Sequence, residues 1–241
     1  MRPADTRHRG PHPADADLFA SRWVPVLRQA VAELSWLLTR DYPPTATLKL
    51  VGDRYALTER QRWAVGRAAC ADEARTRRLA TLLPPAALAG RPVAIDGFNL
   101  IITLEAALSG GVVLRGRDEA WRDLSSIHGT YRAVQETDRA IQLVAAALRP
   151  LAPGPVRWLL DQPVSNSGRL AARLRELGAE LGLPWTAEVV MNPDRELAET
   201  TTEVVVTSDS AVLDRAGAWL NLAPLALAAE LPRWLFDLSA G

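Results

Sequence analysis

The sequence contains almost no lysine and almost no cysteine. Among its 241 residues, 28 are basic, yet Lys49 is the one lysine, and Cys70 is the one cysteine. A single cysteine cannot form an intramolecular disulfide, so a disulfide-stapled fold is excluded and a reducing compartment, the cytoplasm, is expected. With that cysteine and three histidines, a structural zinc site is not expected either.

Long apolar runs and several ligand-binding motifs are also missing. No apolar run reaches the roughly 18 residues that a membrane helix needs, so no membrane span is expected. The opening residues, MRPADTRHRGPHPADAD, contain no apolar segment typical of a secretory signal. No G-x-G-x-x-G follows the first predicted strand, and neither a G-x-x-x-x-G-K-[ST] loop nor a G-x-S-x-G elbow is present. These absences argue against dinucleotide binding, P-loop nucleotide binding and the α/β-hydrolase fold.

The net charge is zero, but the charges are unevenly distributed. Residues 1–91 carry 15 basic and 9 acidic side chains, whereas residues 92–241 carry 13 basic and 19 acidic ones. Such asymmetry predicts two units with different surfaces. The basic half is a candidate polyanion-binding surface, although arginine accompanies high alanine, leucine and proline throughout, so its number alone is weak support for nucleic-acid binding.

The chain divides into four predicted segments. We expect a disordered tail over residues 1–16, a small basic all-α domain over 17–82, a linker over 83–92 and an α/β domain over 93–241. In the all-α part, one helix is predicted to end near Leu38. A capping-box pattern, Thr58-Glu59-Arg60-Gln61, predicts a second helix that continues to about Arg78.

The α/β part shows alternating strand and helix patterns. Predicted strands cover residues 93–95, 112–114, 156–160, 186–190, 203–206 and 219–222. Predicted helices cover residues 99–108, 130–148, 167–181, 194–199, 210–216 and 225–238. This alternation favours a three-layer α/β fold with a parallel sheet, and the tryptophans in predicted strands are expected in its core.

Three of these predicted strands are followed by aspartate. The residues are Asp96, Asp161 and Asp209. Because the carboxyl ends of parallel strands meet at one edge, we expect the three carboxylates to lie together. Clustered carboxylates repel one another unless a cation neutralises them, and oxygen ligands suit Mg²⁺ or Mn²⁺. The pattern predicts phosphodiester hydrolysis, with these residues as catalytic metal ligands and Asp194 as an auxiliary carboxylate.

Each of these polar residues also has a structural alternative. Aspartate at a strand end commonly caps the following helix, which applies well to Asp209 before Ser210. Asn99 is an auxiliary residue that orients a water or a phosphate, or it is a helix cap. Both alternatives remain open from the sequence alone.

Phosphate-binding groups are predicted in two places. Ser165, Asn166 and Ser167 precede a helix whose free N–H groups attract anions, although ordinary capping explains them as well. Arg115, Arg117 and Arg122 lie in or beside a glycine-punctuated loop and are candidates to hold a nucleic-acid backbone, with solvated surface arginines as the alternative. No motif indicates an oligomeric state.

Two short motifs resemble the NYN branch of the PIN-like ribonucleases. The first is Ile95-Asp96-Gly97-Phe98-Asn99-Leu100-Ile101, and the second is Val205-Val206-Thr207-Ser208-Asp209. The resemblance covers roughly residues 92–225 and implies that Asp96, Asp161 and Asp209 bind Mg²⁺ or Mn²⁺ and activate water. Asn192-Pro193-Asp194 replaces the acidic pair typical of that group.

The whole chain also resembles an uncharacterised prokaryotic family, domain-of-unknown-function family 434 with the companion C-terminal domain 5616. The matching stretches are 48–55, 57–62, 96–99, 128–132 and 161–168. We therefore expect a Mg²⁺- or Mn²⁺-dependent nuclease acting on RNA. The alternatives are a catalytically inactive nucleic-acid-binding or scaffold protein with a PIN-like shell, and an enzyme acting on a small phosphorylated substrate.

Overall fold

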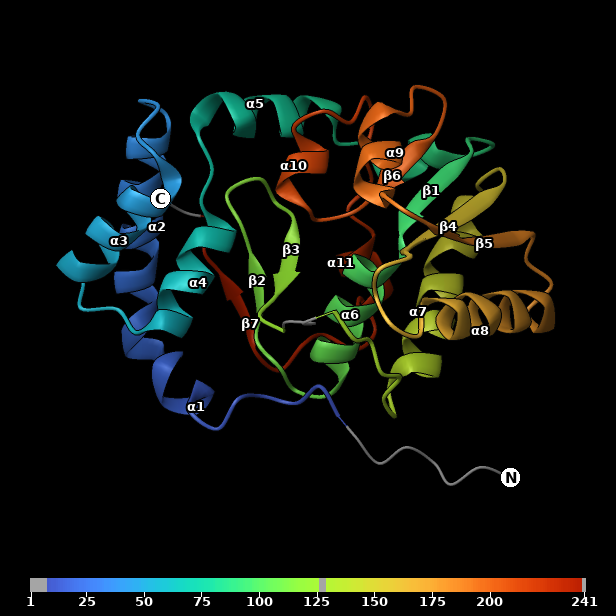
Figure 1. Cartoon of the computed structure of the whole chain (residues 1–241), viewed down its shortest axis with the longest axis horizontal. Helices are drawn as coiled ribbons and strands as arrows, with labels where there is room; N and C mark the ends of the chain where they lie inside the picture. The colour runs from blue at the N-terminus through green and yellow to red at the C-terminus, as the bar shows by residue number, and fades with distance from the viewer. Residues whose placement is uncertain (1–7, 126–128, 240–241) are drawn as a thin grey trace.

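A helical region and an α/β body lie side by side, joined by a small sheet between them (Figure 1). The structure is a computed structural model that describes residues 8–125 and 129–239. The predicted α/β chain with a parallel sheet and a helical N-terminal region is confirmed. No helix within the described residues has the length and apolar character needed to cross a membrane.

The helical region consists of short helices before residue 82. They are α1 (Asp15–Leu18), η1 (Ser21–Trp23), α2 (Val24–Leu38), α3 (Pro44–Arg54), α4 (Glu59–Ala68) and α5 (Asp72–Thr81). The predicted capping box is confirmed, since Thr58 and Gln61 hydrogen-bond to each other's backbone at the start of α4. The prediction that this helix continues to Arg78 is wrong, because Ala69 adopts an extended conformation and ends it.

The main sheet has four parallel strands in the order β5-β4-β1-β6. The strands are β1 (Val93–Asp96), β4 (Val156–Asp161), β5 (Trp185–Val190) and β6 (Val204–Val206). The chain runs from β1 outward to β4 and β5 and then returns to the other side of β1 for β6. The strand order therefore reverses between β1 and β6, which is the position where open α/β sheets bind ligands.

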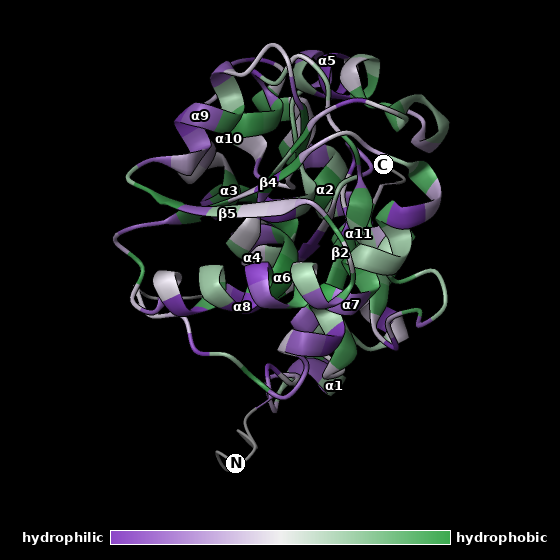
Figure 2. Cartoon of the chain, turned by 90° about the vertical axis from the view of Figure 1, so that its right-hand side faces the viewer, coloured by the Kyte–Doolittle hydropathy of each residue, from purple (hydrophilic) through white to green (hydrophobic). Residues whose placement is uncertain are grey.

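Helices cover both faces of this sheet. On one face lie α6 (Gly97–Leu108), α7 (Thr137–Leu148), α8 (Ser167–Glu180) and α11 (Leu222–Ala226). On the other face lie α9 (Pro193–Glu199) and α10 (Ser210–Leu213). Hydropathy colouring shows α6 as almost wholly apolar and α8 as alternating between apolar and polar (Figure 2), so α6 lies inside and α8 outside.

A second sheet joins the helical region to the body. It has the order β3-β2-β7 and contains β2 (Val113–Arg115), β3 (Trp121–Asp123) and β7 (Leu235–Asp237). Val112 and Leu114 share one apolar core with Leu27, Val31 and other residues of the helical region. The helical region thus packs directly against strands that follow the predicted linker.

Several predicted elements are wrong in this part of the chain. The segment 225–238 is not one helix, because Leu235–Asp237 forms β7 beside β2. Residues 219–222 do not form a strand, and Trp219 makes isolated bridges to Leu82 and Val205. The helix expected from residue 130 begins at Thr137.

The predicted tail and linker differ from expectation as well. Residues 1–7 of the tail lie outside the described residues, but Asp15 begins α1, is fully buried and pairs with Arg60. In the linker, η2 (Pro85–Leu88) places Leu88 in the main core. Residues of the tail therefore pack against the helical region, and the linker packs against the body.

The predicted core residues are confirmed. Trp158 and Trp219 are fully buried, and Trp185 is 8% exposed and stacks edge-on against Trp158. Cys70 is buried as expected for a packed thiol, and burial raises its pKa.

Candidate functional site

The four predicted carboxylates lie at the carboxyl edge of the main sheet. Asp96 ends β1, Asp161 ends β4, Asp209 follows β6 and Asp194 lies in the first turn of α9 after β5. Asp194 interacts electrostatically with each of the other three. The topology therefore brings together the residues that the sequence singled out.

Asp96 is the most buried of these residues, with 6% of its surface exposed. Its two carboxyl oxygens accept hydrogen bonds from the Thr207 hydroxyl at 2.8 Å and from the Asn99 backbone N–H at 3.2 Å. Burial, reinforced by Asp194 and Asp209, raises the pKa of Asp96 to about 7, and the two hydrogen bonds only partly oppose it. At neutral pH this carboxyl group is therefore close to half protonated.

Asn99 connects the ends of β1 and β6. Its side-chain oxygen accepts hydrogen bonds from the Ser208 backbone N–H at 2.8 Å and the Ser208 hydroxyl at 2.9 Å. The helix cap at this point is Asp96, so the capping alternative for Asn99 is wrong. Asn99, Thr207 and Ser208, together with residues of α6, β3 and α11, line a cavity of about 10 Å³, which has room for one water molecule.

Asp209 is the cap of α10, as its structural alternative predicted. One carboxyl oxygen accepts hydrogen bonds from the backbone N–H groups of Ala211 and Val212, at 2.8 and 3.1 Å. The same carboxylate contributes to the raised pKa of Asp96 and Asp194. Capping and an electrostatic role in the site are therefore combined in one side chain.

Asp161 and Asp194 lie farther toward solvent. The pKa of Asp161 is raised by partial burial, and that of Asp194 is raised by loss of surrounding water and then by Asp209 and Asp161. Within residues 8–125 and 129–239, neither these two residues nor Asp96 and Asp209 form an ion pair with an arginine or lysine. The edge therefore carries negative charge that the described side chains do not neutralise.

The donor atoms at this edge are all oxygens, which are the ligands preferred by hard divalent cations. The described parts of the chain nevertheless contain no tight group of three or more His, Cys, Asp or Glu side chains that could hold a metal ion. The residues fit Mg²⁺ or Mn²⁺ in chemical type, and they do not form a ready-made ligand cage.

The predicted phosphate site before α8 is largely occupied by internal contacts. The Ser167 hydroxyl donates to the carbonyl groups of Asp161 and Val164, and the Asn166 side chain donates to the Tyr131 carbonyl at 2.7 Å. Ser165 is exposed, and its backbone N–H bonds to Gly129. Asn166 and Ser167 therefore fix the start of α8 to the end of β4, and their side chains are not available to a phosphate.

The predicted loop arginines are also committed to internal contacts. Arg115 pairs with Glu119 and Asp237, and Arg117 pairs with Asp72 and donates to the Cys70 carbonyl. Each guanidinium thus already has carboxylate or carbonyl acceptors within the chain, and the role of Arg115 and Arg117 as phosphate ligands stays a prediction.

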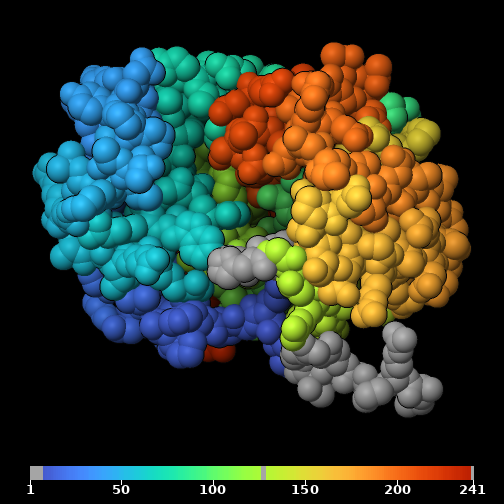
Figure 3. All heavy atoms as spheres, in the orientation of Figure 1, coloured from blue at the N-terminus to red at the C-terminus, as the bar shows by residue number. Residues whose placement is uncertain are grey.

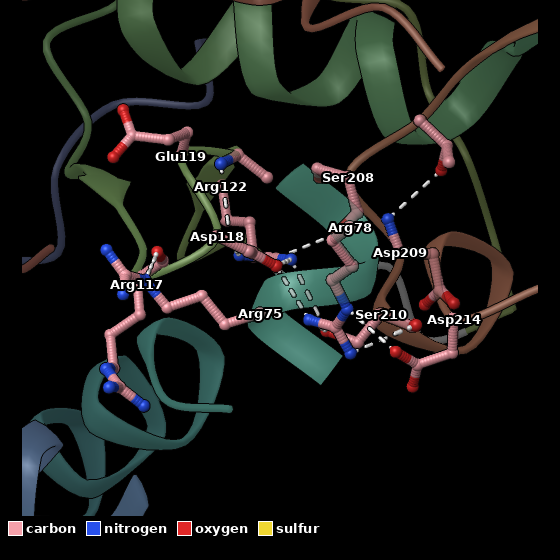
Figure 4. Close-up of polar contacts among 12 residues, drawn as sticks. Arg75, Arg78, Arg117, Asp118, Glu119, Arg122, Ser208, Asp209, Ser210 and Asp214 are labelled. Carbon is pink, nitrogen blue, oxygen red and sulfur yellow. Dashed lines mark hydrogen bonds and ion pairs between the residues drawn. The ribbon is translucent and has the colours of Figure 1, made fainter. Parts of the chain in front are cut away.

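A buried ion cluster lies next to Asp209 (Figure 4). Asp118 accepts hydrogen bonds from Arg122 at 2.6 and 2.8 Å and from Arg78 at 2.6 Å. Arg122 also donates to the Ser208 carbonyl at 2.7 Å, and Arg78 donates to the Ser210 carbonyl at 3.2 Å. The two guanidiniums therefore hold the backbone on both sides of Asp209.

Sequence reasoning missed two residues near this edge. Asp123 at the end of β3 is 4% exposed and accepts hydrogen bonds from the Thr103 hydroxyl and the Ser125 N–H, both at 2.7 Å. Arg67 on α4 interacts electrostatically with Asp123, Arg122 and Asp209. The sequence does contain a signal for Arg67: it lies on the side of its helix that carries the apolar Ala64 and Ala68, where a charged residue is unexpected.

Two family models match the chain. The one described as "Domain of unknown function (DUF5616)" matches residues 85–225, and "Protein of unknown function (DUF434)" matches residues 26–80. The uncharacterized protein MJ0935 of Methanocaldococcus jannaschii is 30% identical over 187 residues, which are 78% of this chain and 88% of that protein. No solved structure matches the chain. The first match contains the four edge carboxylates, and the second contains Arg67.

Proposed function

Because the chain belongs to the family that joins DUF434 to DUF5616, whose descriptions assign no activity, we propose its function from the site. We propose that the protein is a Mg²⁺- or Mn²⁺-dependent nuclease that hydrolyses phosphodiester bonds in RNA. The fold that goes with this proposal is a PIN-like domain preceded by a basic helical region.

The observation that carries the proposal is the unneutralised carboxylate edge. Asp96 and Asp209 flank the position where the strand order reverses, and Asp161 and Asp194 lie farther along the same edge. None of the four has a basic partner among the described residues. The pKa of Asp96 is raised to about 7, first by burial and then by Asp194 and Asp209. Perturbed carboxylates at a ligand-binding edge are typical of active sites. The resemblance of the segments 95–101 and 205–209 to NYN ribonucleases supports the same function.

A divalent cation would be held by Asp96 and Asp209, with Asp161 and Asp194 as further ligands. When bound, Mg²⁺ or Mn²⁺ supplies positive charge that polarises a phosphate and lowers the pKa of a water ligand. Asn99 and Thr207 orient the carboxyl end of β1 against that of β6. The Arg78–Asp118–Arg122 cluster keeps the backbone of Asp209 in place.

The test is cleavage of a mixed-sequence, end-labelled RNA by the full chain with Mn²⁺, with Mg²⁺ and with EDTA. We expect cleavage with either cation and none with EDTA. Asp96→Asn and Asp209→Asn should each lower the rate at least 100-fold, since each removes a charged ligand. Asp138→Asn removes an exposed aspartate on α7 and serves as the matched control. Equal cleavage by the wild type and Asp96→Asn would show that the nuclease is a contaminant.

A non-catalytic RNA-binding protein is the second candidate. It is favoured by one observation, namely that the described residues do not form a ready-made group of three ligands. It predicts RNA binding that weakens with salt, no cleavage with Mn²⁺ and no heat of Mn²⁺ binding in calorimetry. Mn²⁺ binding that is lost in Asp209→Asn would exclude this candidate.

A further inference from the structure

A cleft opens between the helical region and the α/β body. Figure 3 shows a hollow between the cyan atoms of the helical region and the yellow and orange atoms of the body, with green atoms at its floor. In Figure 1, α4 lies on one side of β2 and β3, and the segment of β6 and α10 lies on the other side. Arg67 on α4 interacts electrostatically with Asp209, so the helical region contributes a positive charge near the carboxylate edge.

Arg67 on α4 is an arginine with no partner in the described parts of the protein. Its Nε is buried and has no hydrogen-bond acceptor, and its guanidinium forms no ion pair with any described carboxylate. Asp123 and Asp209 act on it electrostatically without direct contact, while burial lowers the pKa of the guanidinium. Arg67 as a whole is partly exposed, so its guanidinium combines a buried nitrogen that lacks an acceptor with access to solvent. It therefore retains hydrogen-bonding capacity for an anionic ligand.

The position of Arg67 is fixed by its neighbours in the chain. The next residue, Ala68, accepts a hydrogen bond from the Arg117 backbone N–H at 2.9 Å, and the Cys70 carbonyl accepts one from the Arg117 guanidinium at 2.8 Å. These contacts attach the end of α4 to the loop between β2 and β3. Arg67 is therefore preorganised, and a ligand would not have to order the helix that carries it.

We propose that Arg67 is the phosphate-binding residue of this cleft, so that the DUF434 and DUF5616 parts build one site together. A phosphate offers a planar guanidinium two acceptor oxygens and supplies the negative charge that Arg67 lacks within the described chain. The bound phosphate lies near Asp209, beside the edge at which the proposed function places hydrolysis. The inference deepens the proposed nuclease function, but binding by Arg67 does not require cleavage.

The experiment measures binding in EDTA, where metal-dependent cleavage does not occur. The probes are a fluorescein-labelled mixed-sequence 12-nucleotide single-stranded RNA, followed by anisotropy, and adenosine monophosphate, followed by calorimetry. Arg67→Gln should weaken binding tenfold or more and lower the salt slope of RNA binding by about one. Arg67→Lys, which retains charge without the planar fork, should recover part of the affinity. Arg22→Gln removes an exposed arginine from the same region and should change affinity less than twofold.

The melting temperature separates a binding role from a structural one. Because Arg67 has no partner to lose, Arg67→Gln should keep or raise the melting temperature of the full chain. A lower melting temperature with unchanged binding would overturn the proposal, as would a wild type that binds neither probe. Binding of RNA and adenosine monophosphate, or of either alone, that is lost in Arg67→Gln supports it and identifies the source of the phosphate.

These outcomes are independent of the nuclease test. If Asp96→Asn cleaves as the wild type does, the nuclease function fails while Arg67-dependent binding in EDTA still stands. If Arg67→Gln binds as the wild type does, this inference fails while metal-dependent cleavage still stands.

Discussion

Asp96 and Asp118 are two buried aspartates near Asp209, and their electrostatic environments are opposite. Asp118 is 1% exposed and accepts hydrogen bonds from the guanidiniums of Arg78 and Arg122. Asp96 is 6% exposed and accepts hydrogen bonds from neutral donors, Thr207 and the Asn99 N–H. Burial alone would raise the pKa of both carboxyl groups.

The pKa values of the two carboxyl groups shift in opposite directions because, among the described residues, only Asp118 has cationic partners. Arg122 and Arg78 overcome burial and lower the pKa of Asp118 to about 2, whereas the pKa of Asp96 is raised to about 7. The comparison teaches that this chain can neutralise a buried carboxylate when stability requires it. An unneutralised carboxylate edge beside such a cluster therefore supports the proposed binding site.

The largest expected effect is the loss of the paired aspartate. Asp118→Asn removes the counter-charge of two buried guanidiniums, so we expect the free energy of unfolding to fall by about 3–5 kcal/mol. Urea denaturation at pH 7 measures it. Asp138→Asn, which breaks the exposed pair with Arg173, should cost less than about 1 kcal/mol. If the two variants are equally stable, the cluster does not hold the fold together.

The sequence predicted the main sheet well because its signals are local. The apolar runs of β1 and β6 are continuous, and those of β4 and β5 are interrupted only by Arg157, Thr186 and Glu188. Each strand ends in an aspartate or is followed by one within four residues. The parallel arrangement then places those aspartates at one edge without any further information. Fold class and the carboxylate edge could therefore be predicted together.

The second sheet and the arginine roles could not be predicted in this way. Leu235–Asp237 becomes a strand only because β2 lies beside it, although more than 100 residues separate the two. Helix α3 was missed because its apolar face is interrupted by threonine and glycine. Arg115 is paired and Arg67 is not, and this difference depends on which carboxylates the folded chain brings near each one.

The second prediction is a pH-dependent gain of stability in Asp96→Asn. The carboxyl group of Asp96 has a pKa of 3.8 as an ordinary aspartate and about 7 in the fold. Its contribution to the free energy of unfolding is therefore fully present below pH 3.8, where the group is protonated in both states. It is lost as the pH rises to 7, because the unfolded chain ionises first. The free energy of unfolding of Asp96→Asn, measured relative to that of the wild type, should therefore increase by about 2–3 kcal/mol between pH 5 and pH 8.

Urea denaturation at both pH values in EDTA tests this prediction. Asp138→Asn is again the control and should follow the wild type. If Asp96→Asn and the wild type lose stability in parallel from pH 5 to pH 8, then Asp96 is ionised in the fold and the comparison with Asp118 collapses.

The smallest expected effect is a change in the pKa of Asp96 that separates the contribution of burial from that of repulsion by the neighbouring carboxylates. Asp194→Asn removes one negative charge from the edge without touching Asp96, so it should lower the pKa of Asp96 by a few tenths of a unit at most. The carboxyl ¹³C chemical shift of Asp96 gives this pKa directly. Asp138→Asn changes the net charge equally from outside the edge, so it should leave the pKa of Asp96 unchanged.

A shift in the pKa of Asp96 in Asp194→Asn alone means that the carboxylates act as one electrostatic group, to which a single cation would bind. No shift in either variant means that burial alone perturbs Asp96, and the case for a shared cation weakens accordingly.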